Sequence, residues 1–375
     1  MNMQQMPLLF TERVSFELRS LYNRYGYSQY KMSKFEEYDL YARNKDFLIS
    51  DRVITFMDTN GKLMALKPDV TLSIVKNSKD LPSSVQKLYY HENVYRVAKG
   101  TQGFKELMQV GLECLGNIDD YCISEVLLLA AESLRSISED SVLDISHLGL
   151  LSELIDALGI PHSSKAEVLR CIGQKNLHEL TALCRSLELP ENSVDVLRQV
   201  VSTAGAPEAV LPPLRELLAG IVDIRPLEQL LRVTEVVEDP AVRRLLRIDF
   251  SVVDDIHYYN GIVFKGFVAG LPESVLSGGQ YDNLMRRLKR KAGAIGFAVY
   301  TDLLERLEKT TNDSDVDAVL LYDETTPLMA IKTQMDLLMK RGSSVLAQQC
   351  LPENITCRQI LDLRSGEVKL LENHA

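Results

Sequence analysis

Apolar side chains recur at helical spacing near the start of the chain, over residues 11–26. Three of them share one face of the predicted helix: Phe16, Leu18 and Leu21. We predict Thr11 as the N-cap of this helix and Gly26 as the residue that ends it. The opening residues therefore predict an amphipathic helix packed against a core.

Short β-like stretches follow this helix. The Asn-Gly pair within residues 58–61 predicts a hairpin turn. Pro68 breaks the next strand-like run, and Asp69 stands where it can cap a helix that begins near Val70. Two further strand-like runs then flank a glycine-containing loop: KLYYHENVYRV and ELMQVGLECLG.

The pattern changes to a largely helical, leucine-rich one from about residue 123 to 237. Breaks are predicted at Gly159-Ile160-Pro161, Pro190, Pro207 and Pro212-Pro213. A β pattern returns at LLRIDFSVV and HYYNGIVFKGFV, and a Gly-Gly turn leads into the helix YDNLMRRLKRK. The last sixty residues read as strand, helix and strand. This succession predicts an α+β fold with an antiparallel sheet, a helical insertion and a small C-terminal α/β domain.

Composition narrows the function classes. The chain is 46% hydrophobic and 25% charged, which is ordinary for a globular protein, and its net charge of -10 disfavours non-specific nucleic-acid binding. Its first twenty residues have neither a secretory signal nor a membrane span, so we expect a cytoplasmic protein without membrane contact. The six cysteines lack C-x-x-C spacing, so we expect reduced, mostly buried thiols and no metal site.

The strand over residues 107–115 holds the most informative polar pattern. One face carries Gln109, Gly111 and Glu113 between two leucines, and alternate residues of the other face are apolar. Gln109 and Glu113 lie about 13 Å apart at roughly 3.3 Å per residue. Glycine between them predicts an empty bay suited to a small zwitterion. Ordinary polar alternation on a half-exposed strand explains the same residues, and from this strand alone it is favoured.

Two other polar groups have both a binding and a structural interpretation. Asp69 and Thr71, at the start of a predicted helix, can bind an ammonium group or simply cap the helix. Arg96 ends a strand beside a flexible loop, where its guanidinium can grip a carboxylate or phosphate, or be only solvated. Neither group decides the function alone.

Aromatic and glycine residues complete the candidates. The pair Tyr258-Tyr259 is predicted to place one ring on each face of a strand, where a tyrosine can stack on a flat ring or belong to an aromatic core. Gly278 and Gly279 allow close backbone approach to a ligand, or form a turn.

Read in order, these blocks resemble the motifs of histidyl-tRNA synthetases. The resemblance covers most of residues 8–310 and weakens in the last sixty. It rests on five ordered blocks: KPDVT, the strand-loop-strand VYRVAKGTQGFKELMQVGLECLG, HYYNGIVF, LSGGQYDNL and GAIGFAVYTDLLERL. It implies a class II aminoacyl-tRNA synthetase-like core over residues 1–149 and 232–312. The insertion then spans residues 150–231 and the C-terminal domain residues 313–375.

The resemblance also implies a role for each candidate residue in binding histidine. Asp69 and Thr71 would hold the α-amino group, and Arg96 would grip a carboxylate or α-phosphate. Gln109 and Glu113 match the glutamine and glutamate that bind the amino acid. The side chains implied around the imidazole are Tyr258, Tyr259 and Tyr281.

The departures from the family pattern concern its catalytic arginines. Asp254 stands at the place of the histidine-specific arginine, and Leu303 at that of the motif 3 arginine, unless the register slips to Arg306. Further changes replace the motif 2 H-E-R by Val97-Ala98-Lys99, the motif 1 proline by Ser33 and the arginine of G-G-R-Y-D by Gln280. Losing one electrostatic contact typically costs about 10²–10³ in rate. The pattern therefore predicts a preserved amino-acid site without catalytic residues.

A paralogous family with this pattern is that of regulatory subunits of short-form ATP phosphoribosyltransferase. The resemblance implies a non-catalytic subunit, without cofactor, that binds the catalytic subunit and L-histidine and forms a homodimer. No tRNA is expected as a partner. Two alternatives stay open: a divergent histidyl-tRNA synthetase and a stand-alone histidine sensor.

Overall fold

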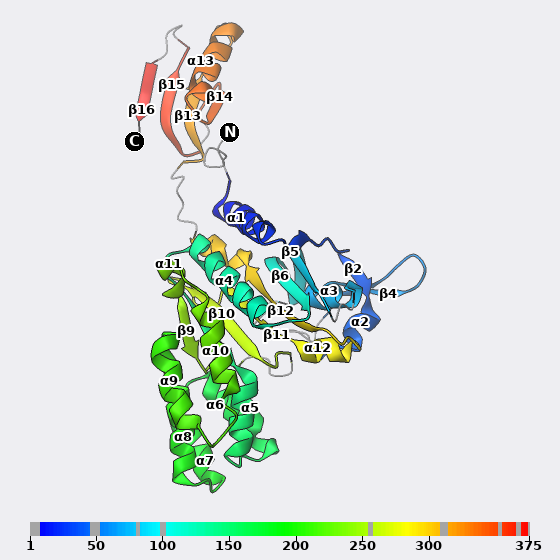
Figure 1. Ribbon diagram of the computed structural model, residues 1–375. Helices are drawn as coiled ribbons and strands as arrows, with labels where there is room; N and C mark the ends of the chain where they lie inside the picture. The colour runs from blue at the N-terminus through cyan, green and yellow to red at the C-terminus, as the bar shows by residue number, and fades with distance from the viewer. Residues whose placement is uncertain are drawn as a thin grey trace. The chain divides into compact units, whose positions relative to one another are not determined.

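The computed structural model describes residues 8–45, 53–79, 83–97, 103–253, 258–307, 314–351, 355–364 and 369–373. The chain divides into two compact units, residues 1–307 and residues 308–375. Figure 1 labels the helices and strands of both units. The finer predicted division of the first unit into a core and an insertion stays a prediction.

A nine-stranded sheet organises the first unit, in the order β1-β5-β6-β12-β11-β10-β7-β9-β8. Among the described strand pairs of this sheet, only β1–β5 and β7–β9 are parallel. The strands are β1 (Ser28–Gln29), β5 (Val85–Val97), β6 (Phe104–Gly116), β7 (Ser141–His147), β8 (Ala204–Gly205), β9 (Leu246–Asp249), β10 (Ile262–Val268), β11 (Leu276–Gln280) and β12 (Gly293–Tyr300). The predicted antiparallel sheet is therefore confirmed.

Helices cover both faces of this sheet. Leucines and valines of α1 (Phe10–Arg24) and α4 (Asp120–Ile137) join one core cluster with β6 residues Val110 and Leu112. Helix α3 (Thr71–Asn77) packs on the opposite face, where Leu72 and Ile74 meet β5 and β6. A small sheet, β2-β4-β3, also belongs to this side; its strands are β2 (Phe35–Glu37), β3 (Thr55–Met57) and β4 (Leu63–Leu66).

Between β7 and β9 the chain forms a largely helical segment. Its helices are α5 (Leu148–Ala157), α6 (Lys165–Gly173), α7 (Leu177–Ser186), α8 (Glu191–Ser202), α9 (Pro207–Leu218), α10 (Arg225–Glu235) and α11 (Pro240–Arg243), with a 3-10 turn at His162–Ser164. The predicted break at Pro212-Pro213 is wrong, because α9 continues through both prolines. The helical prediction also missed β7, whose Leu143 and Ile145 enter the main core.

Two local predictions near the N-terminus had different outcomes. Helix α1 is N-capped at Leu9 instead of Thr11: the carboxylate of Glu12 accepts a hydrogen bond from the Leu9 N–H at 3.0 Å. The hairpin is confirmed, since β3 and β4 pair in antiparallel fashion. Its turn uses Asp58, whose carboxylate accepts from two backbone N–H groups, and Gly61, at φ 77°.

Further elements complete the described part of the first unit. They are α2 (Tyr38–Ala42), α12 (Asp282–Arg287) and a 3-10 helix at Thr301–Leu307. The predicted Gly278-Gly279 turn is wrong, because both glycines lie inside β11. Close strand packing needs small residues there, and the chain turns only at Tyr281, the N-cap of α12.

The second unit has a four-stranded sheet and one described helix. Its strand order is β14-β13-β15-β16, with β13 parallel to β14 and β15. The elements are β13 (Val316–Leu321), α13 (Leu328–Lys340), β14 (Val345–Gln348), β15 (Cys357–Asp362) and β16 (Lys369–Asn373). The predicted strand, helix and strand are confirmed, whereas β15 and β16 were not predicted.

Strand β6 holds its place through two long registers. It pairs with β5 from Phe104 to Gly116 and with β12 from Gln109 to Gly116. The predicted alternation of its faces is confirmed: Val110, Leu112 and Cys114 join the core cluster of α1 and α4, while Leu107 and Leu115 face α3. None of the described helices is both long and apolar enough to cross a bilayer.

Candidate functional site

A buried carboxylate, Glu113 of β6, is the centre of the predicted site. It is 2% exposed, and both of its oxygens accept hydrogen bonds from hydroxyl groups. Thr71, at the start of α3, donates to Oε1 at 2.6 Å, and Tyr281, after β11, donates to Oε2 at 2.5 Å. Three segments far apart in the sequence therefore meet at one side chain.

Asp69 and Arg96 form the neighbouring part of the cluster. One Asp69 carboxylate oxygen accepts a hydrogen bond from the Leu72 N–H at 2.7 Å, as the capping prediction required. The Arg96 Nε donates to the Pro68 carbonyl at 2.8 Å, so the guanidinium lies beside the same short segment. Both side chains are buried, which makes Arg96 more than a solvated strand end.

Burial sets the protonation of the two carboxyls. Desolvation, with a smaller contribution from the nearby charge of Asp69, raises the pKa of Glu113 to about 8 against the lowering effect of the hydrogen bonds from Thr71 and Tyr281. Desolvation also raises the pKa of Asp69, against the Leu72 N–H and the charge of Arg96. A buried acid is costly to ionise without a nearby cation. The cluster is therefore arranged to favour a positively charged group.

The three predicted tyrosines gather beside Glu113. The ring centroid of Tyr258 is 4.7 Å from that of Tyr259 and 5.8 Å from that of Tyr281. The expectation that Tyr258 and Tyr259 lie on opposite faces of a strand is wrong: they precede β10, in irregular backbone that lets both rings pack together. Tyr258 and Tyr281 are buried, and Tyr259 is half-buried.

Tyr90 of β5 belongs to the cluster and was not predicted. It is paired directly opposite Gly111, and its hydroxyl would lie 2.4 Å from a Cβ atom added at that glycine. The bay predicted over Gly111 is therefore occupied by the Tyr90 ring. A tyrosine opposite a glycine in two paired strands is the sequence signal that would have found it.

Gly296 of β12 is a second residue that the sequence did not single out. A Cβ atom there would lie 1.9 Å from Oε2 of Glu113 and 2.4 Å from the Leu112 carbonyl. Because Gly296 is paired with Glu113, only a hydrogen at this position leaves room for the carboxylate. The sequence shows this glycine in the GAIGFA block, but only the register of β12 with β6 places it opposite Glu113.

The glycines of β11 differ in their surroundings. A Cβ on Gly278 would meet the Gly296 carbonyl and Phe297, both at 2.4 Å, so Gly278 gives room to a neighbouring strand. A Cβ on Gly279 would meet the ring of Tyr259 at 2.8 Å, which puts Gly279 beneath the tyrosines. Next to them, the Gln280 side chain accepts a hydrogen bond from the Ile262 N–H at 2.8 Å.

Gln109 is buried on the same face of β6 as Glu113, towards the other end of the strand. Its register partners are Glu92 in β5 and Tyr300 in β12. Glu92 forms an ion pair with Lys67, whose side chain is fully buried. The lysine of the KPDVT block thus has a carboxylate partner inside the protein.

The positions that depart from the family pattern also have definite surroundings where they are described. Leu303 packs against the apolar cluster of α1 and α4, and Arg306 is exposed. The Ser33 hydroxyl accepts a hydrogen bond from the Phe35 N–H at 3.1 Å. Asp254, Ala98 and Lys99 lie outside the described residues.

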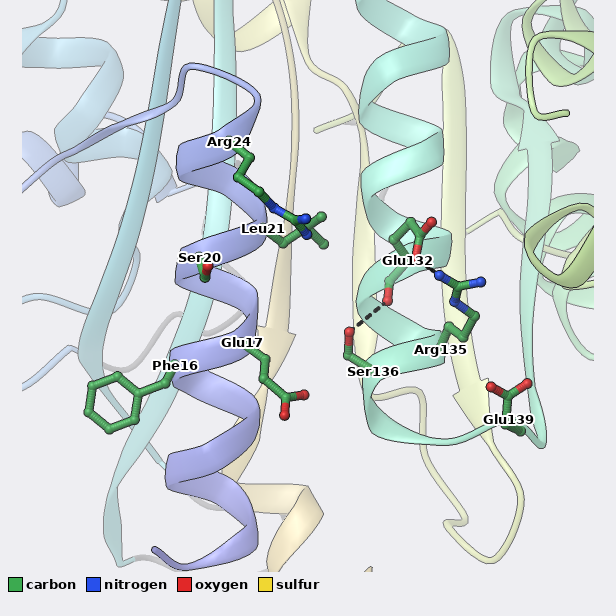
Figure 2. A pocket seen from close by; sticks show the side chains of 9 residues that line it. All are labelled: Phe16, Glu17, Ser20, Leu21, Arg24, Glu132, Arg135, Ser136 and Glu139. Carbon is green, nitrogen blue, oxygen red and sulfur yellow. Dashed lines mark hydrogen bonds and ion pairs between the residues drawn. The ribbon is translucent and has the colours of Figure 1, made fainter. Parts of the chain in front are cut away.

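A separate groove lies on the other side of the sheet, between α1 and α4 (Figure 2). It has a volume of about 620 Å³ and is lined by Phe16, Glu17, Ser20, Leu21, Arg24, Glu132, Arg135, Ser136 and Glu139. Arg135 is held in ion pairs with Glu132 and Asp239, and the lining includes side chains of both charge signs. None of the predicted site residues lines it.

Sequence relatives include both kinds of protein that the motifs resemble. The ATP phosphoribosyltransferase regulatory subunit of Clostridium kluyveri is 29% identical over 315 residues, which cover 81% of this chain and 80% of that protein. The histidine–tRNA ligase of Methanococcus aeolicus is 28% identical over 334 residues, 86% of this chain and 76% of that protein. Identity alone does not separate the two.

A solved structure shares the fold. A chain of the ATP phosphoribosyl transferase (HisG:HisZ) complex from Thermotoga maritima matches with a TM-score of 0.62 and 21% identity, over 79% of this chain and 98% of that one. The predicted class II synthetase-like fold is confirmed. A family model described as histidyl-tRNA synthetase matches residues 9–307, and this chain therefore belongs to the histidyl-tRNA synthetase family.

Proposed function

We propose that this chain is the regulatory subunit of a short-form ATP phosphoribosyltransferase, without catalysis of its own. In this role it is required for the activity of the catalytic subunit and for feedback by histidine. The name of the Clostridium kluyveri relative supports the role. The two-protein complex named for the Thermotoga maritima structure supports a catalytic subunit as the partner.

One observation carries the proposal: the amino-acid cluster is intact while a catalytic position is apolar. Asp69, Thr71, Glu113 and Tyr281 converge in the buried site. At the position of the motif 3 arginine, partly buried Leu303 packs against the main core. An apolar side chain there cannot neutralise a phosphate, whereas adenylation needs such charge stabilisation. A site that binds but does not activate is what a sensor requires.

The ligand of this site is L-histidine in our proposal. Asp69, Thr71 and Glu113 take its ammonium group, and Arg96 its carboxylate. The buried tyrosines Tyr258 and Tyr281, with half-buried Tyr259, surround the imidazole, which a tyrosine ring can stack on. Gln109 lies on the same strand face as Glu113 and completes the polar lining.

Feedback then follows from coupling between two states of the complex. Histidine inhibits if it binds the inactive state more tightly than the active state. By reciprocity, a ligand or partner that favours the active state weakens histidine binding by the same factor by which histidine weakens the binding of that ligand or partner. This chain pairs with a second copy in our proposal, and neither tRNA nor membrane is a partner. We place the protein in the cytoplasm.

The first test is phosphoribosyl transfer by the same organism's catalytic subunit, with and without this chain, across a histidine titration. We expect this chain to raise the activity and histidine to suppress it. Activity that is indifferent to this chain contradicts the partnership.

A second candidate, a divergent histidine–tRNA ligase, is favoured by the Methanococcus aeolicus relative and by exposed Arg306, which can replace the missing arginine after a small shift in register. Histidine-dependent exchange of pyrophosphate into ATP separates the two, because a ligase catalyses it and a regulatory subunit does not. A stand-alone sensor binds histidine but leaves both reactions unchanged.

A further inference from the structure

The carboxyl groups of Asp69 and Glu113 are buried in one cluster, and no lysine or arginine of the described residues forms an ion pair with Glu113. In the described part of the chain, both Glu113 oxygens accept hydrogen bonds from hydroxyl groups only. Arg96 faces Asp69, where its charge lowers the pKa of that carboxyl, but its Nε is directed to the Pro68 carbonyl. The cluster therefore has one carboxyl more than it has positive charges.

A second observation concerns a buried hydroxyl group near Asp69. Tyr41 of α2 is fully buried, and its hydroxyl has no hydrogen-bond partner among the described residues. Burial raises the pKa of this hydroxyl, and the charges of Asp69 and Glu36 raise it further. Buried hydroxyls normally find a partner. A polar ligand group next to Asp69 would supply one.

We propose that an amino acid's ammonium group, on entering this cluster, displaces one proton from the Glu113 carboxyl. Ligand binding and proton release are then a single exchange of one cation for another. The carboxyl O–H bond breaks, the proton leaves to solvent, and the ammonium takes its place beside the carboxylate. This inference rests on the proposed amino-acid ligand and adds a regulation by pH to it.

The groups that face Glu113 support the exchange. Thr71 from α3 and Tyr281 after β11 donate hydrogen bonds to it. Burial raises the pKa of Tyr90 in β5 and of Tyr258 before β10, and the charge of Glu113 raises both further. Asp69, before α3, adds a like charge. Gly296 opposes it from β12 without a side chain. Hydroxyl groups tolerate either protonation state of a carboxyl, because each can donate or accept.

The direction of the pH dependence follows from the free protein. Below its pKa of about 8 the Glu113 carboxyl is protonated, and an adjacent ammonium favours the ionised form. Histidine affinity should therefore rise with pH up to about 8, by as much as about tenfold per pH unit, and then level off. Near neutral pH the affinity of the site for histidine would therefore change with small changes in pH.

The test is calorimetric titration of L-histidine into the full chain at pH 7.5, in phosphate and in Tris. These buffers have different heats of ionisation, so the difference between the measured heats counts the protons released. We expect most of one proton per histidine for the native chain and close to none for Glu113→Gln. Glu106→Gln, an exposed change on the same strand, is the matched control and should release as many protons as the native chain.

A second variant tests the inference if Glu113→Gln binds histidine too weakly to be measured. Tyr281→Phe removes one donor to the ionised carboxylate, so the rise in affinity should move to higher pH. Histidine binding without proton release by the native chain overturns the inference and leaves the proposed function standing. An absence of histidine binding at every pH overturns this inference and the ligand assignment, whereas activation of the transferase is judged separately.

Discussion

At the scale of single residues, the cost of ionising Glu113 links the site to the stability of the free protein. The pKa of this carboxyl is raised from an ordinary value of 4.5 to about 8, mainly by desolvation. Between these values the folded chain binds a proton that the unfolded chain has lost. Stability from this group therefore falls as pH rises from about 4.5 to about 8.

Glu113→Gln should consequently stabilise the free protein more at pH 8 than at pH 5, because glutamine cannot ionise. The change keeps the size of the side chain. The amide oxygen can accept a hydrogen bond from one of the two hydroxyls, Thr71 or Tyr281, and the amide NH2 group can donate to the other. Urea unfolding of both proteins at the two pH values measures the difference. An advantage of the variant that is equal at pH 5 and pH 8 would contradict the raised pKa.

Gly296 gives a steric prediction at the same place. Gly296→Ala puts a methyl group against the Glu113 carboxylate and the Leu112 carbonyl, so we expect a loss of about 1–3 kcal/mol or more in stability. Histidine binding should weaken as well, since the carboxylate must move. Gly293→Ala on the same strand is the control, because its nearest contact is at 3.1 Å to the Asp282 side chain. Thermal unfolding and calorimetry compare the two, and equal effects would argue against a special role for Gly296.

At the scale of elements, α4 depends on its first turn. Asp119 is the N-cap, and its carboxylate accepts a hydrogen bond from the Cys122 N–H at 2.9 Å. This bond holds the pKa of Asp119 below its ordinary value. Helix α4 supplies many side chains of the main core, so its start affects the whole first unit.

We expect Asp119→Ala to lower the free energy of unfolding by about 1 kcal/mol, and Asp119→Asn to lower it much less, because asparagine also caps. The contribution of the carboxylate is fully present above about pH 4 and is lost as pH falls through its lowered pKa. The cost of the alanine change should thus be the same at pH 7 and pH 5. Chemical unfolding at both values checks this, and a cost that disappears at pH 5 would exclude the charged cap.

The elements also show what sequence pattern can and cannot predict. The hairpin at Asn60-Gly61 and the two faces of β6 were predictable because each depends on residues close in the sequence. Strand β7 was missed, since SVLDISH is short and lies among leucine-rich helices. Its pairing with β10 and β9 is made by residues about a hundred positions away, which no local period reveals.

Prediction of the candidate site was limited in the same way, because its residues come from segments far apart in the sequence. Asp69, Thr71, Glu113 and Tyr281 were predicted together only through ordered motifs, and the structure brings them into one cluster. Tyr90 and Gly296 were missed because their roles come from lying opposite β6, a property of sheet register. The separation of Tyr258 from Tyr259 was wrong because irregular backbone replaces the strand that was expected.

At the scale of the molecule, every described contact of the candidate site lies within the first unit, residues 1–307. This unit has its own extensive core, and the second unit has smaller apolar clusters of its own. We therefore expect a chain that ends at Leu307 to fold and to bind histidine as the full chain does. Circular dichroism and calorimetric titration measure both properties. Loss of binding by a folded truncated chain would show that residues 308–375 contribute to the site.

Side chains along β6 alternate between the candidate site and the main core, and this alternation restricts which mutations the strand can accept during evolution. Glu113 faces the site, and its neighbours Leu112 and Cys114 face the main core, with β5 and β12 fixed on either side. Inserting or deleting one residue would exchange the two sets, placing a carboxylate in the core and leucines in the site. Mutational drift in this strand is thus confined to substitutions at fixed length. A lineage could alter the ligand of the site by replacing single side chains while it inherits the strand's length unchanged.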